Sequence, residues 1–385
     1  MTCPRSLRLA GPAAGTAALV AGALLAAGPA VASAAGARSP AGASPAGLSA
    51  AKAHWRVIRS FVAHNTTFDS VAALPDGSAW FGGESPASKP LLEHLSKGKW
   101  HSNSLPGPVG SFVGTVSATS DSNVWLDESG ATAAVGHLTK HGWATRSFAI
   151  GTDDVLMDTL VTTGPKNTWV LDYDFTTKIA YAYHNTGSAS WKRVTLPAHT
   201  SADSAISASS ARNIWVVGNV GASGTWATLR YNGKKWQVVP LPASLDVPKG
   251  NFAEVEGILA VSPASVFVTV LTSSETKSGP IVLLHWNGHS WRRVFNKLPP
   301  GNLRGPIAPD GSGGIWLAGS NTAFTKGELF HYARGHWTTA AEPATSQIMI
   351  VGTLALIPGT RSLYGAAEIN PAFGDSGARV LRYGG

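Results

Sequence analysis

The chain has 385 residues, of which 44% are hydrophobic and 14% are charged, and a formal net charge of +8. This composition excludes a disordered chain, and the length is that of one large domain or two to three ordinary ones. The 43 glycines, 24 prolines and 14 tryptophans favour an all-β protein with frequent tight turns.

Residues 1–34 predict a secretory signal peptide. Arg5 and Arg8 form a short positive region, residues 19–27 form an apolar core, and small residues near Ala32–Ala34 offer cleavage sites. The alternative is an uncleaved anchor, which the short apolar core disfavours because a membrane span needs about 20 apolar residues. We therefore expect a secreted, extracellular protein.

Cleavage at this site leaves a chain without cysteine. Cys3 is the only one, so the mature protein would have neither a disulfide nor thiol chemistry, and the loss of two arginines lowers the net charge from +8 to +6. Residues 35–50 are rich in Ala, Gly, Ser and Pro and predict a flexible leader. Residues 51–385 are then expected to form one folded domain without a membrane span.

The rest of the chain repeats one pattern. A short strand carries an aromatic residue every 44 to 52 residues, at Trp80, Trp125, Trp169, Trp215, Phe267, Trp316 and Tyr364. A tryptophan follows each hairpin turn, at Trp100, Trp143, Trp191, Trp236, Trp291 and Trp337. Self-similarity at this period, with about four short strands per unit, predicts a β-propeller.

The unit around Trp215 illustrates the predicted blade. Its four strands are expected at residues 204–209, 213–218, 225–231 and 235–240. The inner strands are built of small and β-branched residues, which suit the narrow centre of a ring, whereas the large aromatics occupy the wider outer part. We therefore interpret the tryptophans as packing between blades.

The last unit is incomplete. Residues 379–383 match a third strand, and the sequence then ends without the outer tryptophan. Residues 54–58, with Trp55, resemble the outer strand around Trp337. We predict that a strand at about residues 53–60 completes the last blade, which gives seven four-stranded antiparallel blades and no exposed strand edge.

Six copies of a pattern similar to W-x-x-G…L-x-H-W-N-G-x-x-W-x-x-V-x-x-P span this region. They resemble the repeats of secreted bacterial seven-bladed β-propellers, whose architecture galactose oxidase and the sialidases share. The resemblance implies a fold but no specific functional family, since propellers carry many unrelated activities.

Individual propeller families can be tested by their residues. A mature chain without cysteine excludes the cysteine-linked tyrosine of copper-radical oxidases. The Asp-Gly turns at Asp76 and Asp310 only partly match the Asp boxes of sialidases, and the run from Pro75 to Phe81 resembles one repeat of streptogramin-type lyases. An Asp-Gly turn between strands needs no catalytic explanation.

Histidines recur at the end of the third strand. They are His94, His137, His184, His285 and His331, with Arg230 and Arg382 at the same position in two units. One histidine per blade, far from the axis, cannot supply the three or four ligands that zinc needs. We interpret them as structural residues near the hairpin turn, and we assign no metal site.

Carboxylates stand at three equivalent inner-strand positions. Asp69, Asp158 and Glu256 each lie eleven residues before the first aromatic of their unit. They are expected to ring the mouth of the central channel, where they could hold a calcium ion or raise the pKa of one carboxyl by crowding. The alternative is a set of hydrated carboxylates at a wide opening.

A second acidic group falls in the second and third units. The residues expected to contact a ligand are Asp127, Glu128, Asp158, Asp172 and Asp174, which we place in loops on one face of the ring. This loop face, formed by the connections between second and third strands and between blades, would receive a cationic or carbohydrate ligand. Paired carboxylates would also suit glycoside chemistry.

The opposite face, formed by the hairpin turns, carries basic residues. They are Lys97, Lys99, Lys234, Lys235, Arg292 and Arg293. This hairpin face could touch anionic cell-wall polymers or nucleic acid by charge alone, but a solvated rim is the simpler interpretation.

The sequence thus favours a monomeric, non-enzymatic binding or scaffold protein that uses the loop face. Its expected ligand is a carbohydrate, a cell-wall polymer or another protein, and not a nucleic acid. No catalytic residue and no cofactor other than calcium is assigned. The alternative is a lyase or glycoside-active enzyme with carboxylates near the channel.

Overall fold

The computed structural model describes residues 54–384 apart from short segments. The segments outside the description are 62–64, 106–111, 130–133, 147–154, 175–178, 188–189, 198–199, 222–224, 243–250, 275–276, 295–301, 322–324, 344–346 and 370–376. The predicted signal peptide, 1–34, and leader, 35–50, also lie outside the described residues. Within the described part, no helix is long and apolar enough to cross a membrane.

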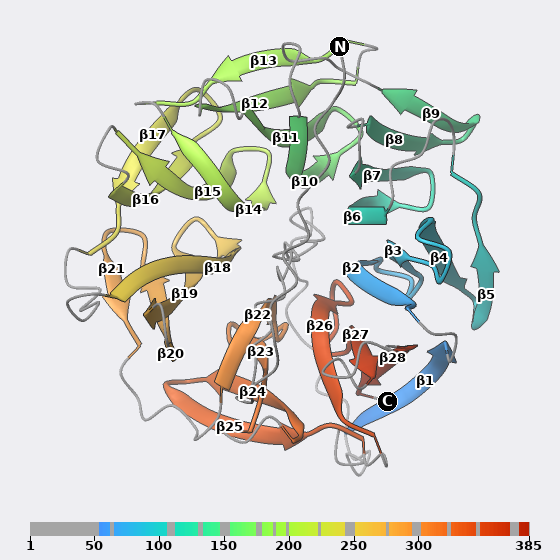
Figure 1. Ribbon diagram of the computed structural model, residues 1–385. Coiled ribbons are helices and arrows are strands. Elements are labelled where there is room, and N and C mark those ends of the chain that lie inside the picture. The colour runs from blue at the N-terminus through green and yellow to red at the C-terminus, as the bar shows by residue number, and fades with distance from the viewer. Residues whose placement is uncertain are drawn as a thin grey trace, which may run out of the picture.

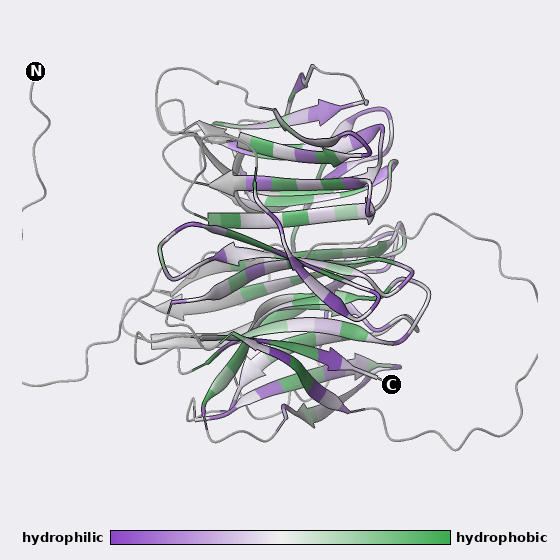
Figure 2. Cartoon of the chain, turned by 90° about the vertical axis from the view of Figure 1, so that its right-hand side faces the viewer, coloured by the Kyte–Doolittle hydropathy of each residue, from purple (hydrophilic) through white to green (hydrophobic). Residues whose placement is uncertain are grey.

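The described residues form 28 strands in seven four-stranded antiparallel sheets. The sheets stand as blades around a central axis, with the first strand of each nearest the centre (Figure 1). Figure 2 shows the ring from the side, with hydrophobic residues distributed along the strands of the blades. The predicted seven-bladed β-propeller is confirmed.

The strands fall into four sets by their place in the blade. The inner strands are β2 (Thr67–Ala73), β6 (Phe112–Ser120), β10 (Val155–Gly164), β14 (Ser201–Ser210), β18 (Asn251–Ser262), β22 (Asn302–Pro309) and β26 (Met349–Leu356). The second strands are β3 (Ala79–Glu84), β7 (Asn123–Ser129), β11 (Asn167–Asp174), β15 (Asn213–Val220), β19 (Ser265–Ser274), β23 (Ile315–Ser320) and β27 (Leu363–Ile369).

The remaining two sets complete the blades. The third strands are β4 (Pro90–Ser96), β8 (Ala134–Thr139), β12 (Ile179–Asn185), β16 (Thr225–Tyr231), β20 (Lys277–Trp286), β24 (Gly327–Ala333) and β28 (Gly377–Tyr383). The outer strands are β5 (Lys99–Ser102), β9 (Gly142–Arg146), β13 (Lys192–Thr195), β17 (Trp236–Pro240), β21 (Trp291–Arg293), β25 (His336–Ala341) and β1 (Trp55–Phe61).

The N-terminal strand closes the ring as predicted. β1 pairs antiparallel with β28, and Trp55 lies opposite Tyr383. Trp55 is 4% exposed and meets Trp316 of the sixth blade edge-on, with ring centroids 5.9 Å apart. It therefore occupies the place that the outer tryptophan takes in the other blades.

The two repeated aromatic positions pack between blades. The first aromatic of one blade meets the outer tryptophan of the next, as Trp80 does with Trp143 at 6.3 Å and Trp169 with Trp236 at 5.4 Å, both nearly perpendicular. Small residues let the inner parts nest: a Cβ at Gly82 would lie 2.6 Å from side-chain atoms of Val113. The tryptophans are thus structural, and the taper of the blade explains their number.

Local chemistry explains the hairpin turns. In the turn between β20 and β21, Gly288 has φ of 95°, a conformation that suits glycine. The side-chain oxygen of Asn287 accepts hydrogen bonds from the backbone N–H groups of His289 and Ser290, at 3.0 and 2.9 Å. An Asn-Gly turn of this kind fixes how the third and outer strands pair.

Candidate functional site

The inner strands share a β-bulge near the loop face. In β2 the pairing with β3 shifts between Phe68 and Ser70, which leaves Asp69 as the extra residue. The backbone pairing places Asp158 of β10 and Glu256 of β18 at the corresponding shifts in the third and fifth blades. A bulge bends its strand and redirects the extra residue, and bulges are frequent beside functional sites.

The structure brings Asp69 together with carboxylates of other strands. Glu84 ends β3 of the same blade, and Glu368 lies near the end of β27 in the last blade. The strongest charges acting on Asp69 are those of Glu368, Glu84 and Asp127, and all are negative. We call Asp69, Glu84 and Glu368 the carboxylate cluster; all three side chains are half-buried.

Burial and like charges change the protonation of the cluster. Burial first, and then the charges of Glu368 and Glu84, raise the pKa of Asp69 from 3.8 to about 7, against a lowering hydrogen bond with Thr67. Burial also raises the pKa of Glu368. Near neutral pH Asp69 therefore exchanges its proton readily, which is unusual for a carboxyl group.

Two of the residues predicted to contact a ligand are buried. Asp127 and Asp172 are each 1% exposed and lie within β7 and β11, not in loops. The Oδ1 atom of Asp127 accepts a hydrogen bond of 2.7 Å from the backbone N–H of Thr115, at the bulge of β6. Glu128 and Asp174 also lie within strands, and Asp158 lies within β10, so the prediction that these five residues lie in loops was wrong.

Sequence reasoning missed Glu84 and Glu368 as neighbours of Asp69. Both stand four residues after the first aromatic of their unit, Trp80 and Tyr364. An alignment of the second strands would have shown that only these two units carry glutamate there. Glu84 comes near Asp69 through the pairing of β3 with β2 within the first blade, whereas the proximity of Glu368 depends on the packing of β2 against β27 in the closed ring.

The recurrent histidines are structural, but their role differs from the one predicted. Each lies directly across from the first aromatic of its unit, and the rings stack; for Trp125 and His137 the centroids are 3.7 Å apart and the planes 11° apart. Nε2 of His137 and Nε1 of Trp125 both contact Oδ1 of Asn123, at 3.1 Å. The histidine thus secures the second strand to the third, and not the turn itself.

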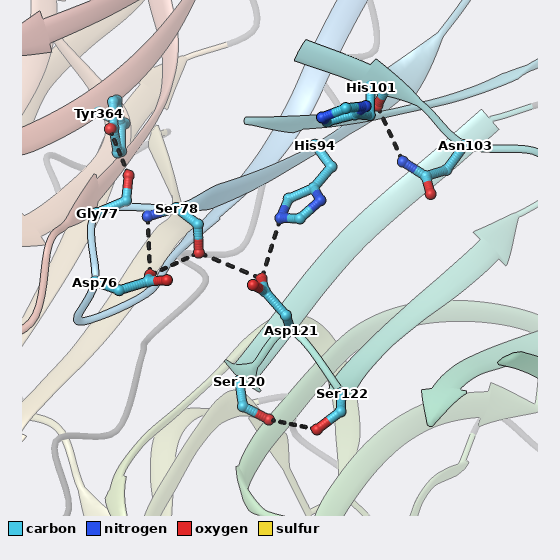
Figure 3. A network of polar contacts seen from close by, with 10 residues as sticks. All are labelled: Asp76, Gly77, Ser78, His94, His101, Asn103, Ser120, Asp121, Ser122 and Tyr364. Carbon is cyan, nitrogen blue, oxygen red and sulfur yellow. Dashed lines mark hydrogen bonds and ion pairs between the residues drawn. The ribbon is translucent and has the colours of Figure 1, made fainter. Parts of the chain in front are cut away.

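In the first blade, a polar network links His94 to the second blade. In Figure 3, Asp121 of the second blade faces His94, and Ser78 lies between Asp121 and Asp76. The Oδ1 atom of Asp121 lies 3.0 Å from Nε2 of His94, and Ser78 donates hydrogen bonds to both Asp121 and Asp76. The hydroxyl of Tyr364 donates to the backbone oxygen of Gly77 at 2.7 Å. Hydrogen bonds therefore hold the Asp-Gly turns at Asp76 and Asp310 in place. In the second of these turns, the backbone N–H and the hydroxyl of Ser312 both donate to the carboxylate of Asp310.

The described residues contain no group of three or more His, Cys, Asp or Glu side chains that could hold a metal ion. The carboxylate cluster is an acidic surface in which the pKa of Asp69 is raised to about 7. A positively charged group is the ligand that such a surface attracts most directly, because it relieves the repulsion among the carboxylates.

Comparisons with known proteins give the fold. No protein-family model matches the sequence. No curated protein matches it either. Among solved structures, the chain is similar to one described as YCF48 bound to D1 peptide, with a TM-score of 0.58 and 13% identity over 86% of this chain and 97% of that one.

Two further structures have the same kind of fold. The WD40 β-propeller domain of Doa1 has a TM-score of 0.52 and 12% identity, over 86% of this chain and 97% of that one. The GH74 xyloglucanase from Xanthomonas campestris has a TM-score of 0.55 and 11% identity, over 83% of this chain and 54% of that one. At such identities the likeness is one of fold, and the protein is a seven-bladed β-propeller.

Proposed function

We propose that the protein is an exported binding propeller whose carboxylate cluster receives a cationic segment of another protein. The observation that carries this proposal is Asp69: the charges that act on it most strongly are all negative, and they raise its pKa to about 7 together with burial. Keeping like charges together costs stability, and such sites are candidates for function.

The fold supports a binding role. The inner strands converge near the axis, so ligands at the loop face meet side chains from several blades at once (Figure 1). The similar structure of YCF48 is described as bound to a peptide, which is an instance of a propeller of this size acting as a binder. Binding a cation would favour the ionised form of Asp69 and displace its proton.

The test is a calorimetric titration of the protein with a hexa-arginine peptide at about pH 6 and pH 8. If the peptide binds only ionised Asp69, the apparent affinity should rise about tenfold between these pH values, since the pKa lies near 7. Hexaglutamate serves as the control peptide and should not bind at the cluster.

Two variants distinguish peptide binding at the carboxylate cluster from attraction by other charges of the protein. Asp69→Asn should weaken peptide binding and abolish its rise with pH, whereas Asp121→Asn, which removes an exposed charge on the hairpin face, should leave both unchanged. Equal binding by Asp69→Asn and the unaltered protein would contradict the proposal.

A second candidate is catalysis by the same cluster, as in a lyase or glycoside-active propeller. One observation favours it: a carboxyl with a pKa of about 7 can act as a general acid or base near neutral pH. Incubation with a panel of plant and bacterial polysaccharides tests it. A product that forms with the unaltered protein and not with Asp69→Asn would replace the binding proposal.

Export is proposed from the N-terminal segment. The composition of residues 1–34 supports it, with a positive start, an apolar core and small residues at the end. Mass spectrometry of the protein from culture medium should find a chain that begins near residues 33–35. A cell-retained chain that still begins at Met1 would contradict export.

A further inference from the structure

A groove of about 500 Å³ lies between the third and fourth blades. It opens where the outer strand β13 meets the turn that joins β16 to β17, on the hairpin face. We call it the basic groove and define it by Lys192, Arg193, Tyr231, Lys234, Lys235 and Trp236. It lies on the opposite face from the carboxylate cluster.

The groove is positively charged throughout. Lys192, Arg193, Lys234 and Lys235 are all exposed, and the described residues that line the groove include no carboxylate. Exposed Arg212, on the next turn, packs against Gly233, since a Cβ there would lie 2.6 Å from its Cγ. Several cations without an acid between them repel one another and attract an anion of matching extent.

The turn that carries two of the cations is held in place. The backbone N–H groups of Lys234 and Lys235 both donate to Oδ1 of Asn232, at 3.0 and 3.1 Å. A preformed arrangement lowers the entropy that binding costs. The guanidinium of Arg193, by contrast, lies 3.6 Å from the ring centroid of Tyr181, on the side of β13 that packs toward the second blade, so its charge points away from the groove.

The aromatic floor of the groove bears on the class of ligand. Trp236 is 8% exposed, and Trp169 is 1% exposed because His184 covers its ring at 4.0 Å. Tyr231 is half-buried against both tryptophans. These rings do not form the exposed stacking platform on which single-stranded nucleic acids depend.

We propose that the basic groove binds an anionic glycan, a sugar chain that bears sulfate, carboxylate or phosphate groups. The anionic groups would bond to Lys192 and to Lys234 and Lys235 of the facing turn, and a sugar hydroxyl would bond to Tyr231. The volume lies within the range of about 300–1,000 Å³ that is typical of small-ligand sites. This site is independent of the proposed function, which uses the other face.

The test measures binding of the full chain to five probes in low salt and in 0.5 M salt. Heparin carries sulfate, polygalacturonate carries carboxylate and a teichoic acid carries phosphate; dextran is the neutral control and single-stranded DNA the nucleic-acid control. At least one anionic glycan should bind, more weakly in high salt. The anionic glycan that binds most tightly identifies which anionic group the groove prefers.

Two matched double variants locate the site. Lys192→Ala with Lys235→Ala removes two charges from the groove, whereas Arg292→Ala with Arg293→Ala removes two from the outer strand of the fifth blade, after Trp291. Loss of two ion pairs at the groove should weaken glycan binding about tenfold. The fifth-blade variant should bind as the unaltered protein does.

Several results would overturn the proposal. They are equal loss of binding in both double variants, no loss in either, binding of dextran as tight as that of the anionic glycans, and tighter binding of DNA than of any glycan. Absence of binding to all three anionic glycans would also reject it. Thermal unfolding of both variants checks that the fold is intact.

Discussion

An asparagine, an aromatic ring and a histidine form the smallest repeated unit of this molecule. In the third blade, Oδ1 of Asn167 contacts Nε1 of Trp169 at 3.2 Å and Nε2 of His184 at 2.8 Å. Burial, aided by the charge of Lys192, lowers the pKa of His184, so the stacked imidazole is neutral near neutral pH. The unit satisfies polar atoms inside the blade while burying the ring.

Asn167→Ala tests the energetic role of this unit. The change leaves the polar nitrogens of two side chains without their acceptor, which should cost about 1–3 kcal/mol of unfolding free energy. In the fourth blade Asn213 accepts from Trp215 at 3.0 Å, and an arginine replaces the histidine. Asn213→Ala should therefore destabilise less in denaturant unfolding; an equal or larger loss would contradict the account.

A buried glutamate provides a second residue-level prediction. Burial raises the pKa of Glu342 from 4.5 to about 8, and its Oε1 has no hydrogen-bond partner among the described residues. The unfolded chain ionises at lower pH than the folded one, so Glu342 costs stability progressively as the pH rises from about 4.5 to about 8.

Glu342→Gln should remove this pH dependence, because the amide does not ionise. The melting temperature of the variant should match that of the unaltered protein at about pH 4.5 and exceed it by about 1–3 °C near pH 8.5. Calorimetric melting at both pH values measures the difference. A difference that is the same at both would show that ionisation of Glu342 is not the cause.

At the scale of elements, closure by β1 determines whether the ring has an open edge. β28 would otherwise expose its backbone groups, and Trp55 would leave the space beside Trp316 and Tyr383 unfilled. This strand was predictable because the last repeat lacks a tryptophan that every other repeat has. In a repeat protein, a residue that is absent from one copy is as informative as the residues that recur.

Deletion of β1 should therefore lower the melting temperature strongly and promote association through the open edge. Trp55→Ala, which only empties the buried site, should cost about 3–5 kcal/mol. Val238→Ala, at a residue 36% exposed on β17, is the control and should cost little. Melting and size-exclusion chromatography measure both effects; a deletion that melts like the full chain would contradict closure.

The acidic residues of the strands show what the sequence could predict about the candidate site and what it could not. Spacing placed Asp69 at the same inner-strand position as Asp158 and Glu256, and the backbone pairing agrees. Asp127 and Asp172 were expected in loops, but both lie buried within strands. For Asp127 the partner is the N–H of Thr115, which no local pattern reveals.

At the scale of the molecule, the two faces carry different charge. Described exposed cations of the hairpin face and the adjoining outer strands include Lys97, Lys99, Lys140, Lys166, Lys192, Arg193, Arg212, Lys234, Lys235, Arg292, Arg334 and Arg361. The described carboxylates there are the turn residues Asp76, Asp121 and Asp310. The half-buried carboxylate cluster lies on the loop face. Net charge alone does not show how these charges are distributed between the two faces.

The period of the repeat predicted the whole architecture, but not the sites. Glu368 is far from Asp69 in sequence and comes near it only because the first and last blades adjoin. The basic groove likewise depends on how β13 faces the turn before β17. Sites assembled across blade boundaries need the closed ring before their members can be recognised.

The most direct measurement is the pKa of Asp69, from carboxyl ¹³C NMR with Asp69→Asn to assign the signal. A midpoint of about 7, which falls when the hexa-arginine peptide is added, is the predicted result. A midpoint near the ordinary value of 3.8 would show that the cluster does not hold a proton near neutral pH, and it would contradict the proposed role of the loop face.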